Sequence, residues 1–321
     1  VSYLDQDGVV KDNFMERFNA RLAFSQKALH DRLDIALTGV ITERNYSPSD
    51  PRNFILASNM IPVVPVKNED GTWFESYEYD QGNPVHNIAL NSHLHKNNLY
   101  YGNLKTELQI TKDLTAGINL LKQRETDDFG EYYSKETERG RNDQGFAKRE
   151  SWTTDKKVLE STLNYKKDLG AHNLNILLGY SYEDNHYQNS GAQNRRFATD
   201  LSGYNNIGTG QNLQTGDVWS SANMSKLISF FGRINYKLKD KYIFSASVRR
   251  DGSSKFGTNH KWGTFPSVSA AWRLNEESFL KDVNFLDDLK LRVGYGVSGN
   301  QDNLEPYQSL QLYGAKGVYY D

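Results

Sequence analysis

The sequence predicts an all-β fold, namely part of an antiparallel, up-and-down transmembrane β-barrel with about ten strands of a larger barrel. Three observations predict this fold. Apolar and polar residues alternate with a period of two in many segments. Short and long connections between these segments alternate along most of the chain. Aromatic residues make up 12% of a chain whose mean hydropathy is -0.73, which is typical of barrels whose polar lumen-facing residues alternate with lipid-facing ones.

The alternation is clearest in three segments, 174–184, 226–239 and 289–297. The apolar side chains expected to face lipid there are Leu174, Ile176, Leu178, Tyr180 and Tyr182; Ile228, Phe230, Ile234, Tyr236 and Leu238; and Leu289, Leu291, Val293 and Tyr295. The candidate strands are 14–26, 33–43, 99–111, 114–123, 157–168, 174–184, 226–239, 242–250, 265–274 and 289–297. Many approach the ~10 residues that a tilted strand needs to cross a bilayer.

The connections between these strands fall into two classes. Short turns are expected at 28–32, 112–113, 170–173 and 239–241, and long outer loops at 44–97, 124–156, 185–225 and 251–264. An up-and-down barrel with tight periplasmic turns and long outer loops produces this alternation.

Two connections have features of their own. The connection 275–288 is long where a turn is expected, and a helical turn over 276–281, capped by Asn275, is predicted there. The apolar stretch 53–66 lies inside a polar loop, and we expect it to pack on itself or on a partner.

Composition argues against several other classes of protein. The formal net charge is -2, so the chain has no overall attraction to nucleic acid. No stretch approaches the ~20 apolar residues of a transmembrane helix. Cysteine is absent, which fits a barrel that crosses an oxidising periplasm unfolded, because stray thiols would form disulfides there.

No residue pattern indicates catalysis or a cofactor. His93 and His95 would face the same side of a strand and could share a metal, but no third ligand stands at a suggestive spacing, so surface histidines are the favoured interpretation. Asp127 and Asp128 would diverge on an extended chain and are no catalytic pair. The sequence GTG at 208–210 lacks the strand and helix that flank a phosphate loop.

Three tryptophans, Trp73, Trp152 and Trp219, lie in the expected outer loops. An indole in a polar loop can stack on a sugar ring, or it can simply pin the loop. The second role is the commoner, and both stay open at this point.

The stretch Ser229–Gln301 contains SFFGRINYKLKDKYIFSASVRRDGSSKFGTNHKWGTFPSVSAAWRLNEESF, followed by LKLRVGYGVSGNQ. It resembles the barrel of SusC/RagA-type TonB-dependent transporters. In that family a strand with FGR-x-NY-x-x-x-x-KY leads to RRDGSS-x-F, and strands with W-G-x-FPS-x-S-x-x-W and LR-x-x-YG-x-x-GNQ follow. NEDGTW at 68–73, NPVHNIAL at 83–90 and the opening YLDQDGVV also match. The resemblance is dense over Ser229–Gln301 and looser over the rest of the chain.

The resemblance implies a fragment of a barrel in the bacterial cell outer membrane. Such transporters have ~22 strands and a plugged lumen, and neither a plug domain nor an energy-coupling box is recognised in this sequence. The resemblance also implies import of a glycan or peptide, powered by the TonB complex through an N-terminal part absent from this chain. A SusD-like lipoprotein would close over the outer mouth. The resemblance implies contact with outer-membrane lipid. It implies no enzyme activity, no cofactor and no contact with nucleic acid.

Within such an importer, the loop 185–225 is expected to contact ligand or lid, because it combines aromatic and cationic side chains with many Asn and Gln. The residues expected to make ligand or lid contacts are Tyr187, Arg195, Arg196, Tyr204, Trp219 and Trp152. Arg249 and Arg250 are expected where a strand leaves the membrane, with side chains that snorkel toward headgroups.

A second class of protein remains open, a soluble or surface-attached β-protein that binds carbohydrate or another protein. It would be built as a sandwich or as a smaller closed barrel of about ten strands. A soluble fold would pack Tyr180, Phe230, Tyr236 and Leu291 inside, whereas part of a larger barrel would expose them in a continuous apolar band.

Overall fold

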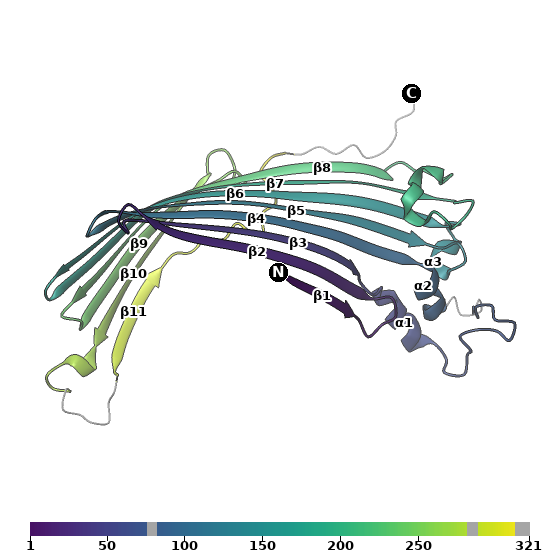
Figure 1. Cartoon of the computed structure of the whole chain (residues 1–321), viewed down its shortest axis with the longest axis horizontal. Helices are drawn as coiled ribbons and strands as arrows, with labels where there is room; N and C mark the ends of the chain where they lie inside the picture. The colour runs from purple at the N-terminus through teal and green to yellow at the C-terminus, as the bar shows by residue number, and fades with distance from the viewer. Residues whose placement is uncertain (76–81, 281–287, 312–321) are drawn as a thin grey trace.

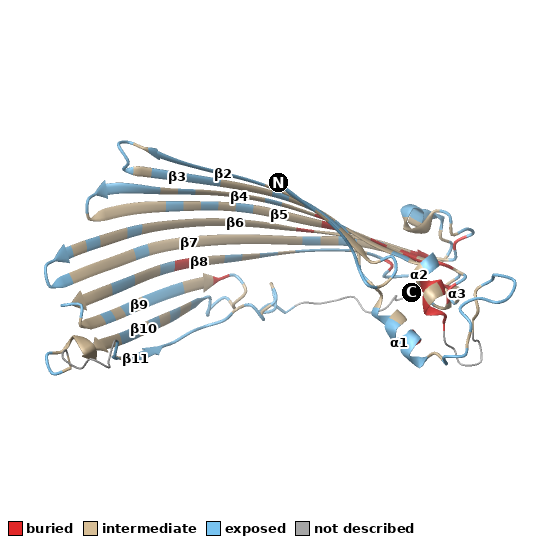
Figure 2. Ribbon diagram, turned by 60° about the horizontal axis from the view of Figure 1, so that its bottom comes forward, coloured by how far each residue is buried: buried red, intermediate tan, exposed pale blue. Residues whose placement is uncertain are grey.

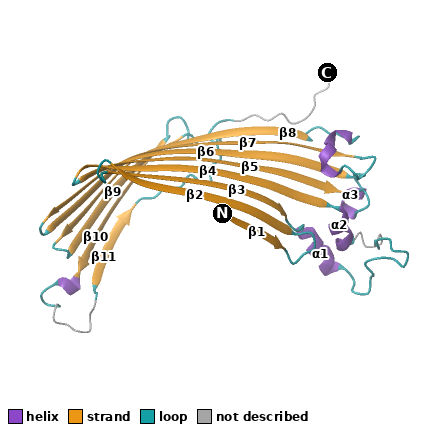
Figure 3. Ribbon diagram, viewed as in Figure 1, coloured by secondary structure: helices purple, strands orange, loops and turns teal. Residues whose placement is uncertain are grey.

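The chain folds into one curved antiparallel sheet, seen in a computed structural model that describes residues 1–75, 82–280 and 288–311 (Figure 1). Within these ranges eleven strands lie side by side in sequence order (Figure 3). They are β1 (Ser2–Asp7), β2 (Phe14–Ala28), β3 (Leu33–Ser47), β4 (Ser92–Thr111), β5 (Leu114–Tyr133), β6 (Phe146–Leu169), β7 (His172–Arg195), β8 (Val218–Leu238), β9 (Tyr242–Ser253), β10 (Trp262–Arg273) and β11 (Lys290–Gly296). The predicted all-β, up-and-down fold is confirmed.

All ten candidate strands are present, and β1 is an additional one. β1 has the sequence SYLDQD, which is short and contains a single aliphatic residue, so it carries little alternation signal. Among the described residues β1 and β11 each have one neighbouring strand, so the sheet is open. The sandwich and the closed ten-strand barrel of the alternative interpretation are therefore wrong.

The apolar side chains predicted to face lipid lie on one face of the sheet, here called the outer face. Leu178, Phe230, Ile234 and Val293 have 54%, 52%, 47% and 70% of their surface exposed. The strand register places apolar residues of neighbouring strands side by side on this face; for example, Ile176 of β7 lies opposite Ile234 of β8. Such a continuous exposed apolar band has no second layer to pack against, which is the arrangement of a lipid-facing barrel wall.

The strands are longer than predicted, and the loops are correspondingly shorter. β6 and β7 each have 24 residues, more than twice the ~10 that a membrane crossing needs. The predicted loops 44–97, 124–156, 185–225 and 251–264 shrink to 48–91, 134–145, 196–217 and 254–261. The strand ends beyond the membrane were missed because both of their faces are polar, which removes the period-two signal.

The connections 48–91, 134–145 and 196–217 lie at one end of the sheet, here called the loop end, where α1 (Pro51–Asn59), α2 (Pro84–Leu90), α3 (Glu138–Arg141) and the 3₁₀ helix η2 (Gly203–Thr209) are found. Most buried residues gather there (Figure 2). The buried hydrophobic side chains are Leu56, Tyr132, Tyr133, Ala147 and Phe197. A one-layer sheet in lipid has no core of its own, so close packing is confined to the part that stands in water.

Two local predictions need correction. The stretch 53–66 forms much of α1 but buries Leu56 as its one fully buried hydrophobic side chain, so packing on itself is wrong. The predicted helical turn 276–281 is instead a 3₁₀ turn, η3 (Leu274–Glu276), without a side-chain cap from Asn275. Residues 281–287 of the connection 275–288 lie outside the described residues. Among the described helices, none is long and apolar enough to span a bilayer.

Candidate functional site

Aromatic side chains form a row across the face opposite the apolar band, here called the inner face. Tyr46 of β3 lies opposite His95 of β4, which lies opposite Phe129 of β5. The rings of Tyr46 and His95 stack with centroids 4.6 Å apart and planes 7° apart. Phe129 lies 4.6 Å from the His95 ring on its other side, and Trp152 of β6 approaches the same ring at 6.0 Å. Strand alternation places all four on the inner face.

The row continues to β8 through Trp219. Trp219 lies opposite Gly191 of β7, where a Cβ would come within 2.4 Å of the indole, so glycine makes room for the ring. The Trp219 Nε1–H donates to Asn189 Oδ1 at 3.0 Å. The ammonium group of Lys148 lies 5.5 Å from the Phe129 ring centroid and 5.4 Å from that of Trp219. The aromatic row, defined as Tyr46, His95, Phe129, Trp152 and Trp219, thus runs across six strands.

Polar groups border the aromatic row on the same face. His95 Nδ1 lies 2.9 Å from Asp127 Oδ1, and His93 Nε2 lies 2.8 Å from Glu131 Oε1. The histidine pair does share one face, as expected. Within the described residues no group of three His, Cys, Asp or Glu side chains is placed to hold a metal ion. The outward-facing Asp128 is exposed and diverges from the buried Asp127.

The predicted contact residues divide into two groups. Trp152, Trp219 and Tyr187 lie on the inner face. Tyr187 belongs to β7, between the strands of Trp152 and Trp219, and lies opposite Thr154 of β6. Arg195 ends β7 on the same face but is occupied, since its Nη1 lies 2.7 Å from Asp217 Oδ2. Four of the six predicted contact residues therefore lie on the inner face of the sheet.

Tyr204 and Arg196 lie elsewhere. Tyr204 belongs to η2 and packs on the outer face, against the cluster formed by Tyr132, Ala147 and Phe197. Its ring occupies the space where a Cβ on Gly130 would be, at 2.5 Å. Arg196 has a left-handed backbone, with φ at 60°. Tyr204 and Trp219 therefore lie on opposite faces, because the loop 196–217 folds back over the outer side of the sheet.

The loop 196–217 is anchored by Asp217. Its carboxylate accepts hydrogen bonds from Gln193 Nε2, the Gln214 backbone N–H and Arg195, each at 2.7 Å. Burial alone would raise the pKa of Asp217, but these donors, Gln193 first, hold its pKa below the ordinary value. The anchor is therefore charged and intact at neutral pH.

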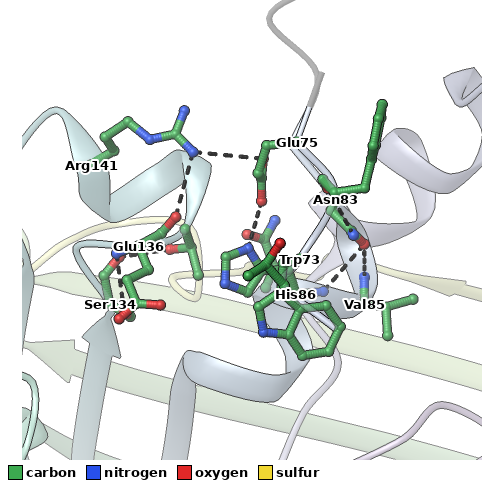
Figure 4. A network of polar contacts seen from close by, with 12 residues as sticks. Trp73, Glu75, Asn83, Val85, His86, Ser134, Glu136 and Arg141 are labelled. Atoms are coloured by element: carbon green, nitrogen blue, oxygen red, sulfur yellow. Dashed lines mark hydrogen bonds and ion pairs between the residues drawn. The ribbon is translucent and has the colours of Figure 1, made fainter. Parts of the chain in front are cut away.

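A second buried network holds the β3–β4 loop (Figure 4). Glu75 Oε1 lies 2.5 Å from His86 Nδ1, and Glu75 Oε2 lies 3.7 Å from Arg141 Nη2. Trp73 stacks on the His86 ring with centroids 5.0 Å apart. The Asn83 side chain accepts from the His86 backbone N–H at 3.3 Å and caps α2. Trp73 thus pins the loop, whereas Trp152 and Trp219 stand on the strand wall.

Some residues of the aromatic row were missed as binding candidates. Tyr46 and Phe129 were placed inside charged loops, where neither stood out, and His95 was considered only as a metal ligand. No local signal marks them, because polar residues surround each one and the row forms only when neighbouring strands pair. Arg249 also needs correction. The Arg249 side chain points inward, and its Nη2 donates a hydrogen bond to Ser229 Oγ at 2.9 Å. Arg250 lies on the outer face, as expected for both residues.

Comparison with known proteins supports one family. A sequence profile described as "TonB dependent receptor-like, beta-barrel" matches residues 25–319. TonB-dependent receptor P3 of Formosa agariphila is 31% identical over 320 residues, covering 96% of this chain and 32% of that protein. TonB-dependent receptor SusC of Bacteroides thetaiotaomicron is 28% identical, covering 99% of this chain and 34% of that protein. The chain thus spans about a third of the length of these relatives.

The fold matches solved structures as well. The RagAB peptide importer in its closed-closed state superposes with a TM-score of 0.76 at 20% identity, covering 93% of this chain and 34% of that one. The shared architecture, the apolar outer face and the match over most of the sequence agree with each other. The chain therefore belongs to the TonB-dependent receptor-like β-barrel family and forms part of an outer-membrane barrel.

Proposed function

We propose that this chain supplies part of the wall and outer loops of a TonB-dependent importer that takes up a bulky glycan or peptide. The observation that carries the proposal is the aromatic row, which lies on the inner face near the loop end. Aromatic faces beside amide and carboxylate groups can stack on and hydrogen-bond a sugar ring or a peptide. None of these contacts makes or breaks a bond, so the proposed role is transport and not catalysis.

Energy for import would come from the TonB complex. We assign contact with that complex to the part of the relatives that this chain does not cover. RagAB is a peptide importer, and the name of the SusC relative specifies no ligand, so we keep both glycan and peptide as candidate ligands.

The apolar segment 53–66, which includes most of α1 and the residues after it, is the proposed contact for a SusD-like lipoprotein lid. Phe54, Ile55 and Val63 have 54%, 60% and 88% of their surface exposed, at the end of the sheet that stands in water. A contiguous exposed apolar patch in water is a feature of protein–protein contact sites. Ion pairs hold the helix in place, with Arg52 Nη2 lying 2.6 Å from Glu138 Oε1.

This assignment shifts the lid contact away from the loop 196–217. That loop buries Phe197 and ties Asp200 to the Tyr132 hydroxyl at 2.6 Å, so much of it is committed to the sheet. Arg195 is likewise committed to Asp217. Trp152, Trp219 and Tyr187 remain the proposed ligand contacts.

The ligand proposal is tested with the full-length protein in detergent, titrated separately with oligosaccharide and oligopeptide mixtures. The variant Trp152→Ala/Trp219→Ala should weaken binding of one mixture roughly tenfold or more, given the usual value of aromatic stacking. Trp262→Ala is the matched control, because Trp262 lies on the outer face with 46% of its surface exposed. Unchanged binding in the double variant would contradict the ligand site, and chemical modification of the ligand would contradict the non-enzymatic role.

The lid proposal has its own test. Phe54→Asp/Ile55→Asp should abolish co-purification of the lipoprotein without changing barrel assembly. Leu201→Asp is the control, since Leu201 is 95% exposed on the other loop. If Leu201→Asp removes the lid and the α1 variant keeps it, the assignment is reversed.

A further inference from the structure

A group of lysines lies on the outer face directly above the apolar band. On β5 the outward position after Leu120 toward the loop end is Lys122, and on β6 the position above Leu159 is Lys157. On β8 the position above Ile228 is Lys226. All three side chains are exposed. They stand where a strand leaves the hydrocarbon on the side of the long loops, which is the headgroup level of the outer leaflet.

Lys122 and Lys157 are direct cross-strand partners. Like charges at such positions destabilise a sheet unless something neutralises them. Neither lysine forms an ion pair with another described residue. By contrast the inner-face Lys156, next to Lys157 in sequence, lies 3.2 Å from Glu183 Oε2. Lys122 and Lys157 thus carry positive charge without an ion-pair partner among the described residues, although the adjacent Lys156 has one in Glu183.

Other charges around the pair do not cancel it. Asp184 of β7 lies between Lys157 and Lys226 by register, one carboxylate beside three lysines. Asp155 is taken by Arg124, whose Nη1 lies 3.7 Å from Asp155 Oδ2. This sector of the outer face therefore keeps a net positive charge.

The positive charge lies in one sector of the outer face, which runs from β5 to β8 and is continued on β9 by the outward-facing Arg250. On β1, β2 and β3 the outward residues near the corresponding edge of the apolar band are the exposed acids Asp5, Glu16 and Glu43. A general preference for basic residues at the membrane edge would not produce this division. The segregation points to a particular anionic group beside β5–β8.

We propose that Lys122, Lys157 and Lys226 bind the phosphate groups of a phosphorylated glycolipid headgroup in the outer leaflet. A phosphate lying between Lys122 and Lys157 would neutralise both ammonium groups at once, and the acyl chains of the same molecule would cover the apolar band below them. Lysine binds phosphate as a point charge and needs no fixed geometry, which suits exposed, flexible side chains. The lysine stems can lie along the apolar surface while the ammonium groups reach the headgroup.

The test uses the full-length protein carrying Lys122→Gln/Lys157→Gln, purified in detergent and titrated with bisphosphorylated lipid A. Native mass spectrometry counts the bound lipid. The double variant should bind roughly 30-fold more weakly, from the usual contribution of a basic residue near an anionic lipid surface. Lys156→Gln is the control for one of the two substitutions, because it removes one positive charge next to Lys157 in sequence but on the inner face.

Two further arms identify the ligand. Lipid A stripped of its phosphates should bind wild type as weakly as phosphorylated lipid binds the double variant. Inorganic phosphate at equal concentration should not displace the lipid, because it lacks the acyl chains. Equal binding by wild type and double variant would overturn the proposal. So would an equal loss in Lys156→Gln, or full displacement by inorganic phosphate. Heat-modifiable electrophoretic mobility checks that each variant is a folded barrel.

Discussion

Arginine at Leu178 should prevent stable insertion of the barrel, whereas arginine three residues away should not. The outward residues of β7 within the apolar band run from Leu174 to Tyr182, and Leu178 is their midpoint. Its side chain is 54% exposed and lies between Leu163 of β6 and Gly232 of β8. The position therefore faces lipid near the midplane of the bilayer.

The magnitude follows from this depth. Arginine on the lipid face costs ~2–4 kcal/mol at the midplane and ~0–1 kcal/mol near the interfaces. Leu178→Arg should therefore lower the folded-to-unfolded ratio by roughly 30- to 1,000-fold, and Tyr182→Arg by no more than about fivefold. Asn175→Arg is the inner-face control. Asn175 lies opposite Lys166 and Asn235 on the inner face. The new arginine would therefore be repelled by Lys166, but it would not face lipid.

The assay is urea unfolding of the full-length protein from lipid vesicles, followed by heat-modifiable electrophoretic mobility. We expect a large loss of stability for Leu178→Arg and small losses for Asn175→Arg and Tyr182→Arg. Equal losses at Leu178 and Asn175 would refute the assignment of faces. Equal losses at Leu178 and Tyr182 would refute the assignment of depth.

Two further predictions concern the loop end. Gly130→Ala places a Cβ within 2.5 Å of the Tyr204 ring, so it should destabilise the packing of loop 196–217 by ~1–3 kcal/mol, detected as faster proteolysis of that loop while the barrel stays folded. Resistance equal to wild type would mean that η2 does not rest on the outer face. Because the folded pKa of Asp217 lies below its ordinary value of 3.8, its contribution to loop stability is complete above that pH and is lost only as the pH falls through the folded pKa. Protection of the loop from protease should therefore be constant from pH 7 to about pH 5 and fall below about pH 4. Asp217→Asn should weaken this protection at neutral pH and make it independent of pH. A loss of protection that is already complete at about pH 5 would contradict the role of Asp217 as anchor.

Much of the fold could be predicted because the membrane imposes it locally. Within the bilayer each strand meets lipid on one face and polar side chains on the other, so alternation alone marks Leu178 and Val293 as outward. The same logic failed beyond the membrane. The ends of β5, β6 and β7 meet water or protein on both faces, and their extension depends on pairing with neighbouring strands.

The candidate site was predicted only in part, for a related reason. Trp152 and Trp219 were singled out by residue type, but their meeting with Tyr46 and His95 depends on the register of six strands. Register is a property of pairs of strands, and no single segment of sequence encodes it. The same holds for Lys122 and Lys157, which are 35 positions apart and meet only across β5 and β6.

The strand periodicity, the up-and-down order, the lipid-facing side and the family can all be read from the amino-acid sequence. Each of these is encoded in local segments of the chain and needs no knowledge of distant contacts. Three features depend on contacts between distant residues: where the strands end, the opposite faces taken by Tyr204 and Trp219, and the inward direction of Arg249. Those outcomes depend on how loops fold back onto a sheet whose outer part stands in water. There packing between distant residues replaces the bilayer as the force that selects the conformation.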